Sequence, residues 1–245
     1  GATVSIPTLL DSQNLYGSIE ALAQQCQHAF DDCQPINLPA EYHQVNKVLM
    51  TGMGGSGLGA RIIESVFGDE IKLPLARLNE YHLPAWVDRQ TLVLCSSFSG
   101  TTEETVANVN EAQKRGCSWL AIAGGGALIE LAKKYHRPYY QINPLYNPSK
   151  QPRMAIGYLV ISQLVLASKI GLFKFSAADL DIAKKAMERV LIKNSRQIAA
   201  ADNEAKKLAV RSIVASGPVI IENGKLLVNK DTKDDFYKLP GGTVE

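Results

Sequence analysis

Short apolar runs that end at a turn and lead into a helical pattern constrain this chain most. Three runs are the clearest: KVLMT (Lys47–Thr51), TLVLC (Thr91–Cys95) and CSWLAIA (Cys117–Ala123). Such runs, bounded by turn residues, are typical of strands buried on both faces of a parallel sheet. Because strand, turn and helix alternate with short connections, the sequence predicts an α/β fold, a three-layer α/β/α sandwich with a parallel sheet.

The same periodicity predicts the other elements. Helices are expected at 15–30, 58–67, 101–115, 128–135, about 176–200 and from about 202, with weaker strands at 73–78 and 139–142. In such a sheet, ligands bind outside the carboxyl ends of the strands. The turns that follow Thr51, Cys95 and Ala123 are therefore where chemistry is expected.

One apolar run, Met154–Phe173, approaches the length of a membrane span. It contains Ser162, Gln163, Ser168 and Lys169, which favours a buried core helix. A net charge of +2 without a Lys/Arg cluster argues against nucleic acid or a membrane as partner. The four cysteines lack C-x-x-C spacing and no signal peptide is visible, so we expect buried free thiols in a cytoplasmic protein.

A glycine turn follows the first of the three runs. Gly52, Gly54 and Gly57 spell G-x-G-x-x-G, which is shared with dinucleotide-binding turns. Such a site needs an acidic residue that ends the next strand and binds the ribose, and here only Glu80 is available, past the strand. An NAD enzyme is thus the weakest alternative, and a tight turn that packs a helix on a strand explains the glycines equally well.

A second turn, SSFSGTTEET (Ser96–Thr105), follows the run TLVLC and opens a predicted helix. The first N–H groups of a helix have no partner within it, and its dipole is positive at that end. Side-chain hydroxyls can add further donors to phosphate oxygens. The sequence therefore predicts a pocket for a phosphomonoester dianion that needs neither lysine nor metal. The alternative is an ordinary N-cap, for which one Ser or Thr suffices.

These two turns resemble the loops of sugar isomerase (SIS) domains, and in particular those of bifunctional phosphoglucose/phosphomannose isomerases. Three more segments carry the resemblance, which covers about residues 8–209. They are an early helix (Leu10, Asp11, Tyr16, Ile19), the motif P-R-x-A-x-G-Y (Pro152, Arg153, Ala155, Gly157, Tyr158) and the motif N-x-A-K-x-L-A (Asn203, Ala205, Lys206, Leu208, Ala209). The resemblance implies aldose–ketose isomerisation of hexose 6-phosphates through an enediolate, without cofactor or metal.

Carried over residue by residue, the resemblance implies four groups of site residues. The phosphate would be bound by Ser97, Ser99, Gly100, Thr101 and Thr102, and the sugar side would be lined by Gly54, Gly55 and Ser56. Thr101 stands where the family often has Asn or Asp. Gly124–Gly126 would form a further rim, for which a permissive loop is the alternative. Arg153 would stabilise the enediolate, because a guanidinium stays charged and presents several donors; a surface charge at a helix end is its alternative.

No general base is identified from the sequence. By resemblance, the family's Glu base and ring-opening His come from a second SIS domain. None of the four histidines (His28, His43, His82, His136) matches those positions. Glu103 and Glu104 follow the phosphate loop, but a glutamate in the first turn of a helix usually complements the dipole.

After residue 208 the helical pattern gives way to β-branched runs, which predicts a domain boundary between 1–208 and 209–245. Asn223–Gly224 lies between β-branched runs and indicates a hairpin, and FYKLPGGTVE (Phe236–Glu245) resembles the start of a Nudix hydrolase domain. An ordinary hairpin is the alternative. Since the chain starts with Gly and ends inside this motif, we expect a fragment. A non-catalytic phosphosugar-binding module fused to a Nudix domain is therefore the second hypothesis, and a single SIS domain also predicts a homodimer.

Overall fold

The computed structural model describes residues 11–215, 221–222, 225–226, 229–230 and 237–238. The chain divides into two compact units, one reaching to Met187 and the other starting at Glu188. The division falls inside helix α7 (Ala177–Lys193).

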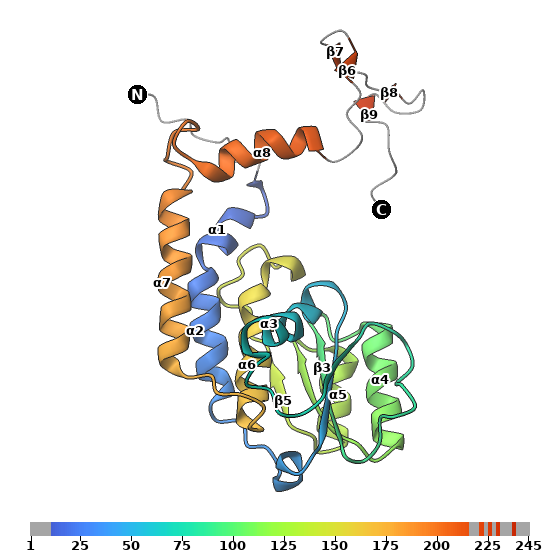
Figure 1. The fold of residues 1–245 in the computed structure, drawn as a ribbon. Coiled ribbons are helices and arrows are strands. Elements are labelled where there is room, and N and C mark those ends of the chain that lie inside the picture. The colour runs from blue at the N-terminus through green and yellow to red at the C-terminus, as the bar shows by residue number, and fades with distance from the viewer. Residues whose placement is uncertain (1–10, 216–220, 223–224, 227–228, 231–236, 239–245) are drawn as a thin grey trace. The chain divides into compact units, whose positions relative to one another are not determined.

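A parallel sheet forms the centre of the first unit (Figure 1). Its strands are β1 (Lys47–Thr51), β2 (Leu75–Leu78), β3 (Thr91–Ser97), β4 (Ser118–Ala123) and β5 (Tyr139–Gln141). They lie in the order β2-β1-β3-β4-β5, and every pairing is parallel. The strand order reverses between β1 and β3, and ligands of such sheets bind at this switch point. The predicted α/β fold with a parallel sheet is confirmed.

Side chains of the central strands alternate between two hydrophobic cores. Val48 and Met50 of β1 belong to one core, whereas Leu49 belongs to the other. The first core also contains residues of α2 (Leu22–Cys33), α3 (Leu58–Phe67) and α6 (Ile156–Lys169). The second contains residues of α4 (Glu103–Lys114) and α5 (Gly126–Lys134). Helices therefore cover both faces of the sheet, as the apolar runs predicted (Figure 1).

Helix α6 corresponds to the long apolar run. Its residues from Gly157 to Ala167 are buried, so the interpretation as a core helix is confirmed. No helix in the described part of the chain is long and apolar enough to cross a membrane.

Two helix predictions differ from the structure. The helix expected at 15–30 is two helices, α1 (Leu15–Glu20) and α2, because Ala21 has ψ of 8°, far from the helical value. Helix α7 ends at Lys193 rather than near Ala200. Asn194 ends it by donating from Nδ2 to the Val190 carbonyl at 2.9 Å, while its Oδ1 accepts the Ala205 N–H at 2.8 Å.

The second unit contains α8 (Glu204–Ala215), which Asn203 caps by accepting the Lys206 N–H at 2.9 Å. The expected boundary near residue 208 lies within α8 and stays a prediction. Short strands β6 (Ile221–Glu222) and β7 (Lys225–Leu226) pair antiparallel, as do β8 (Asn229–Lys230) and β9 (Tyr237–Lys238). The rest of the predicted Nudix-like piece lies outside the described residues and also stays a prediction.

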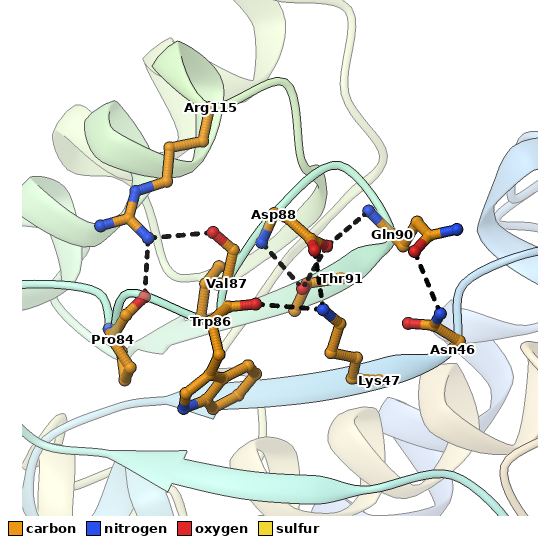
Figure 2. A network of polar contacts seen from close by, with 9 residues as sticks. All are labelled: Asn46, Lys47, Pro84, Trp86, Val87, Asp88, Gln90, Thr91 and Arg115. Atoms are coloured by element: carbon orange, nitrogen blue, oxygen red, sulfur yellow. Dashed lines mark hydrogen bonds and ion pairs between the residues drawn. The ribbon is translucent and has the colours of Figure 1, made fainter.

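The connection from β2 to β3 passes β1 without a helix and is held by side chains of two residues from other parts of the fold (Figure 2). Arg115, which follows α4, donates to the carbonyls of Pro84 and Val87 at 2.7 and 2.9 Å. Lys47, at the start of β1, contacts Asp88 at 2.8 Å. These bonds replace the packing that a crossover helix would provide, and they fix the amino end of β3.

Candidate functional site

Three loops at the carboxyl edge of the sheet contact one another, as expected. The loop after β1 reaches the loop after β3 through Ser56, whose Oγ accepts the Phe98 N–H at 3.3 Å. The loop after β3 reaches the loop after β4, because the Phe98 carbonyl accepts the Gly124 N–H at 2.9 Å. The switch point between β1 and β3 is therefore lined by the turns that the sequence singled out.

Hydroxyl groups cluster in the loop after β3. Ser97 Oγ lies 2.7 Å from Thr102 Oγ1 and 3.4 Å from Ser99 Oγ. Ser99 Oγ also accepts from the Thr101 hydroxyl at 3.2 Å. Ser97 is buried, Thr102 is half-buried, and Ser99 and Thr101 are exposed. The cluster thus runs from the core to the surface and could present several neutral donors to one anion.

The helix that follows this cluster begins without a side-chain cap. Thr102 occupies the N-cap position of α4, but its side chain makes no capping hydrogen bond. Its hydroxyl bonds to Ser97 instead. The first N–H groups of α4 therefore have no side-chain acceptor, and this is the arrangement in which a helix N-terminus favours an anion. An ordinary N-cap does not describe this turn.

Gly100 shapes the loop between the hydroxyl residues. It has φ of +70°, and a Cβ there would lie 1.7 Å from the carbonyl oxygen of Gly125. Only glycine allows both the left-handed conformation and this close approach. The Gly100 carbonyl then accepts the Leu128 N–H at 2.9 Å, which joins the loop to α5.

The glycines of the first loop have two different environments. A Cβ on Gly52 would lie 2.8 Å from the Ser56 carbonyl oxygen, and one on Gly57 would lie 2.7 Å from the Gly52 carbonyl oxygen, so both are needed for the tight turn. A Cβ on Gly54 or Gly55 would meet nothing within 4 Å. These two open positions are the ones that the sequence assigned to the sugar side.

A pocket of about 190 Å³ opens beside the first loop. Its lining consists of Met50, Thr51, Gly52, Gly54, Ser56, Gly57, Ala60, Arg61, Arg77, Asn79 and Gln163. The hydroxyl residues of the second loop do not line this pocket. Ser56 lines it and also accepts the Phe98 N–H of the second loop, so the pocket and the hydroxyl cluster are neighbours. Two arginines line the pocket, and one of them, Arg77, pairs with Glu64 at 2.7 Å.

Gln163 bonds to the first loop and to the end of β3, and it was not assigned a role from the sequence. Its side chain is buried in α6. Nε2 donates to the Ser56 carbonyl at 2.8 Å and lies 3.3 Å from Ser96 Oγ. A Cβ on Gly59 would lie 2.5 Å from Gln163 Oε1, so α3 approaches closely. The signal that could have found it is an amide in an otherwise apolar helix.

Arg153 lies in the short turn η4 (Pro152–Met154) that precedes α6. Its side chain is exposed and makes no hydrogen bond or ion pair with other described residues. Among the described residues, no hydrogen bond joins Arg153 to the hydroxyl cluster. The role that the sequence gave Arg153 stays a prediction, and a guanidinium without a protein partner is free to bind an anion.

Among the described residues, no side chain of a glutamate or histidine hydrogen-bonds to the hydroxyl cluster. Glu103, in the first turn of α4, accepts from the Tyr81 hydroxyl at 3.1 Å, and this bond raises the pKa of Tyr81. His28 bonds to Tyr158 at 3.0 Å. The other three histidines, His43, His82 and His136, are exposed.

Comparison with known proteins finds bifunctional phosphoglucose/phosphomannose isomerases among the relatives of this chain. A bifunctional phosphoglucose/phosphomannose isomerase of Caldicellulosiruptor bescii is 30% identical in an alignment of 233 residues that covers 91% of this chain and 67% of that protein. One of Aquifex aeolicus is 29% identical in an alignment of 199 residues that covers 78% of this chain and 57% of that protein. The chain thus spans only a little over half the length of the Aquifex protein. No family model matches the chain.

A solved structure shows the same fold. The C-terminal domain of glucosamine-fructose-6-phosphate aminotransferase from Francisella tularensis superposes with a TM-score of 0.52 at 13% sequence identity. The match covers 83% of this chain and 59% of that one. At this identity the similarity concerns the α/β fold with its parallel sheet and flanking helices.

Proposed function

The chain belongs to the bifunctional phosphoglucose/phosphomannose isomerase family, and we propose that it binds hexose 6-phosphates for aldose–ketose isomerisation. The reaction would interconvert glucose 6-phosphate or mannose 6-phosphate with fructose 6-phosphate through an enediolate. The observation that carries this proposal is the cluster of Ser97, Ser99 and Thr102 at the uncapped N-terminus of α4. Neutral donors and an oriented backbone suit a phosphate dianion without a metal.

In this proposal each loop has its own task. Ser97, Ser99 and Thr102, with the N–H groups around Gly100 and Thr101, bind the phosphate. Gly54, Gly55 and Ser56 face the sugar, because two open glycines let a ligand approach the backbone closely. Arg153 stabilises the negative charge that develops on the enediolate oxygens.

The base that moves the proton between C1 and C2 is proposed to come from outside the described residues. The four histidines and the first-turn glutamate Glu103 have other environments, as shown above. The general acid–base step needs a side chain within hydrogen-bond reach of the substrate carbon or oxygen.

A second candidate function follows from the same observation. Without a base, the site would bind phosphosugars and not turn them over, as a non-catalytic module fused to a Nudix domain would. A coupled assay for glucose 6-phosphate and mannose 6-phosphate isomerisation, run beside calorimetry with fructose 6-phosphate, separates the two. Turnover supports the isomerase, binding without turnover supports the module, and the absence of binding contradicts both.

A further inference from the structure

The segment that carries Arg153 is irregular, but helices on either side hold it in place. It runs from the end of β5 to the start of α6, with Arg153 near its far end. Because the Arg153 side chain has no partner among the described residues, the backbone beneath it determines where the guanidinium can reach. The contacts of that backbone therefore decide how well Arg153 is placed.

Gln25, on α2, ties this segment down most directly. Its side chain is completely buried. Nε2 donates to the carbonyl of Met154, the residue after Arg153, at 2.9 Å, and to the carbonyl of Tyr146 at 3.0 Å. Gly157 makes this approach possible, since a Cβ there would lie 2.6 Å from the Gln25 Cβ.

Ser18, on α1, forms a second attachment. Its Oγ lies 2.8 Å from Asn147 Oδ1 and accepts the Ser149 N–H at 3.1 Å. Asn147 Nδ2 then donates to the Gln151 carbonyl at 3.0 Å, which continues the connection to the start of η4. Ser18, Asn147 and Ser149 are all buried, so water does not compete with these bonds.

Tyr158, on α6, forms a third attachment. Its Oη accepts the Tyr146 N–H at 3.0 Å and bonds to His28 Nδ1 at 3.0 Å. Both main-chain polar groups of Tyr146 are thus held, the N–H by Tyr158 and the carbonyl by Gln25. The two segments that resembled family motifs, the early helix and the one around Arg153, meet in this network.

The environment of Gln25 indicates that its donors matter more than its bulk. Its Oε1 is buried and has no hydrogen-bond partner. A buried acceptor without a partner is costly, and an apolar side chain of similar size would avoid this cost. The amide is explained if its Nε2 is needed to hold the carbonyls of Tyr146 and Met154.

We infer that helices α1 and α2 are a positioning platform for Arg153, in which Gln25 is the positioning residue that fixes the backbone of η4. This inference rests on the role proposed above for Arg153 toward the enediolate. A guanidinium stabilises developing charge only when it is held at the right place before the reaction. Gln25 does not act on the substrate itself.

The test compares two ligands that differ in charge at one end. Arabinonate 5-phosphate carries a carboxylate in place of the enediolate oxygens, whereas arabinitol 5-phosphate carries a neutral hydroxymethyl group. The dissociation constant of arabinitol 5-phosphate divided by that of arabinonate 5-phosphate, measured by calorimetry on the full chain, reports the contribution of Arg153. We expect Arg153→Ala to reduce this ratio roughly tenfold to a hundredfold, as for a lost hydrogen bond to a charged group.

Gln25→Ala should reduce the same ratio by roughly threefold or more, and the affinity for arabinitol 5-phosphate should stay within about twofold. In the Arg153→Ala background, Gln25→Ala should cause no further change in the ratio, because nothing is left to position. A residue that only stabilises the fold would change the affinities for both ligands together. Gln24→Ala, at the exposed neighbouring position, is the matched control and should leave the ratio unchanged.

Ser18→Ala tests the second attachment and serves where Gln25→Ala does not fold. The inference is overturned if Arg153→Ala lowers the ratio but neither Gln25→Ala nor Ser18→Ala does. An unchanged ratio in Arg153→Ala overturns the role of Arg153 and this inference with it. The loss of binding of both ligands in the unmodified chain would instead contradict the proposed phosphate site.

Discussion

Ser97 Oγ and Thr102 Oγ1 lie 2.7 Å apart, although their residues stand at opposite ends of the loop between β3 and α4. Each hydroxyl is both a donor and an acceptor, so in the free protein the two groups satisfy each other. A phosphate dianion that accepts from both would replace this bond with two charge-assisted ones. The pair is therefore ready to bind an anion without exposing an unpaired group before it arrives.

Removing one hydroxyl from this cluster should weaken phosphosugar binding. We expect Ser99→Ala and Thr102→Ala each to cost roughly 1–3 kcal/mol of binding free energy for fructose 6-phosphate, measured by calorimetry. Ser65→Ala, at an exposed position of α3, is the control and should bind as the unmodified chain does. Unchanged affinity in the Ser99→Ala/Thr102→Ala double variant would mean that the phosphate binds elsewhere.

Gly100→Ala should damage both the loop and the fold. The left-handed conformation and the contact with the Gly125 carbonyl add up to roughly 2–5 kcal/mol in the free energy of unfolding. Gly116 is a matched control, since it also has φ of +70° but a Cβ there would meet nothing within 4 Å. Gly116→Ala should therefore cost only about 1–2 kcal/mol in urea unfolding. Equal losses in the two variants would show that the close approach is relieved elsewhere.

The stability of the fold should depend on pH through Glu111. Its Oε2 accepts the Leu83 N–H at 2.9 Å, and this bond, together with the Arg115 guanidinium, lowers the pKa of the Glu111 carboxyl. The unfolded chain then binds the proton more tightly than the folded one. The stabilisation is therefore complete above the unfolded pKa and is lost as the pH falls through the folded pKa.

Glu111→Gln should reduce the free energy of unfolding by about 1 kcal/mol at about pH 7, and this reduction should become smaller as the pH falls through the folded pKa. Urea unfolding at a series of pH values checks this. Glu130→Gln is the control, because Glu130 is exposed on α5 and its contact with Lys133 is 3.5 Å long. A difference that does not change with pH would show that the carboxylate charge of Glu111 contributes nothing.

The four cysteines should be unreactive in the folded chain. Cys26, Cys33, Cys95 and Cys117 are free and buried. Burial raises the pKa of Cys26 to about 12, so the reactive thiolate is scarce at ordinary pH. An aromatic disulfide reagent should label none of them in buffer and all of them in denaturant. Rapid labelling of a native thiol would contradict the packing of α2 or of the central strands.

The positions of the central strands along the chain could be predicted, because strands buried on both faces appear in the sequence as short apolar runs. The expected strand Lys47–Thr51 and helix 58–67 have the observed bounds. The central strands are mostly apolar because both of their faces are buried. The end of β3 was missed, since the strand continues through Ser96 and Ser97 beyond the predicted end at Cys95. The helix limits at Ala21 and Lys193 were missed, because backbone angles and the side-chain bonds of Asn194 decide them.

By itself, the sequence determined the succession of strands and helices along the chain, the edge of the sheet where ligands should bind and the turn in which hydroxyl groups gather. These features are local, since they depend on which residues follow one another. Only the tertiary structure decided that Gln163 supports Ser56 and that Gln25 holds the carbonyl next to Arg153. Gln163 lies 107 residues from Ser56 and Gln25 lies 129 residues from Met154, and no local pattern records which buried amide will meet which carbonyl. That choice is made when the helices pack, because most buried polar groups then pair with a partner within reach.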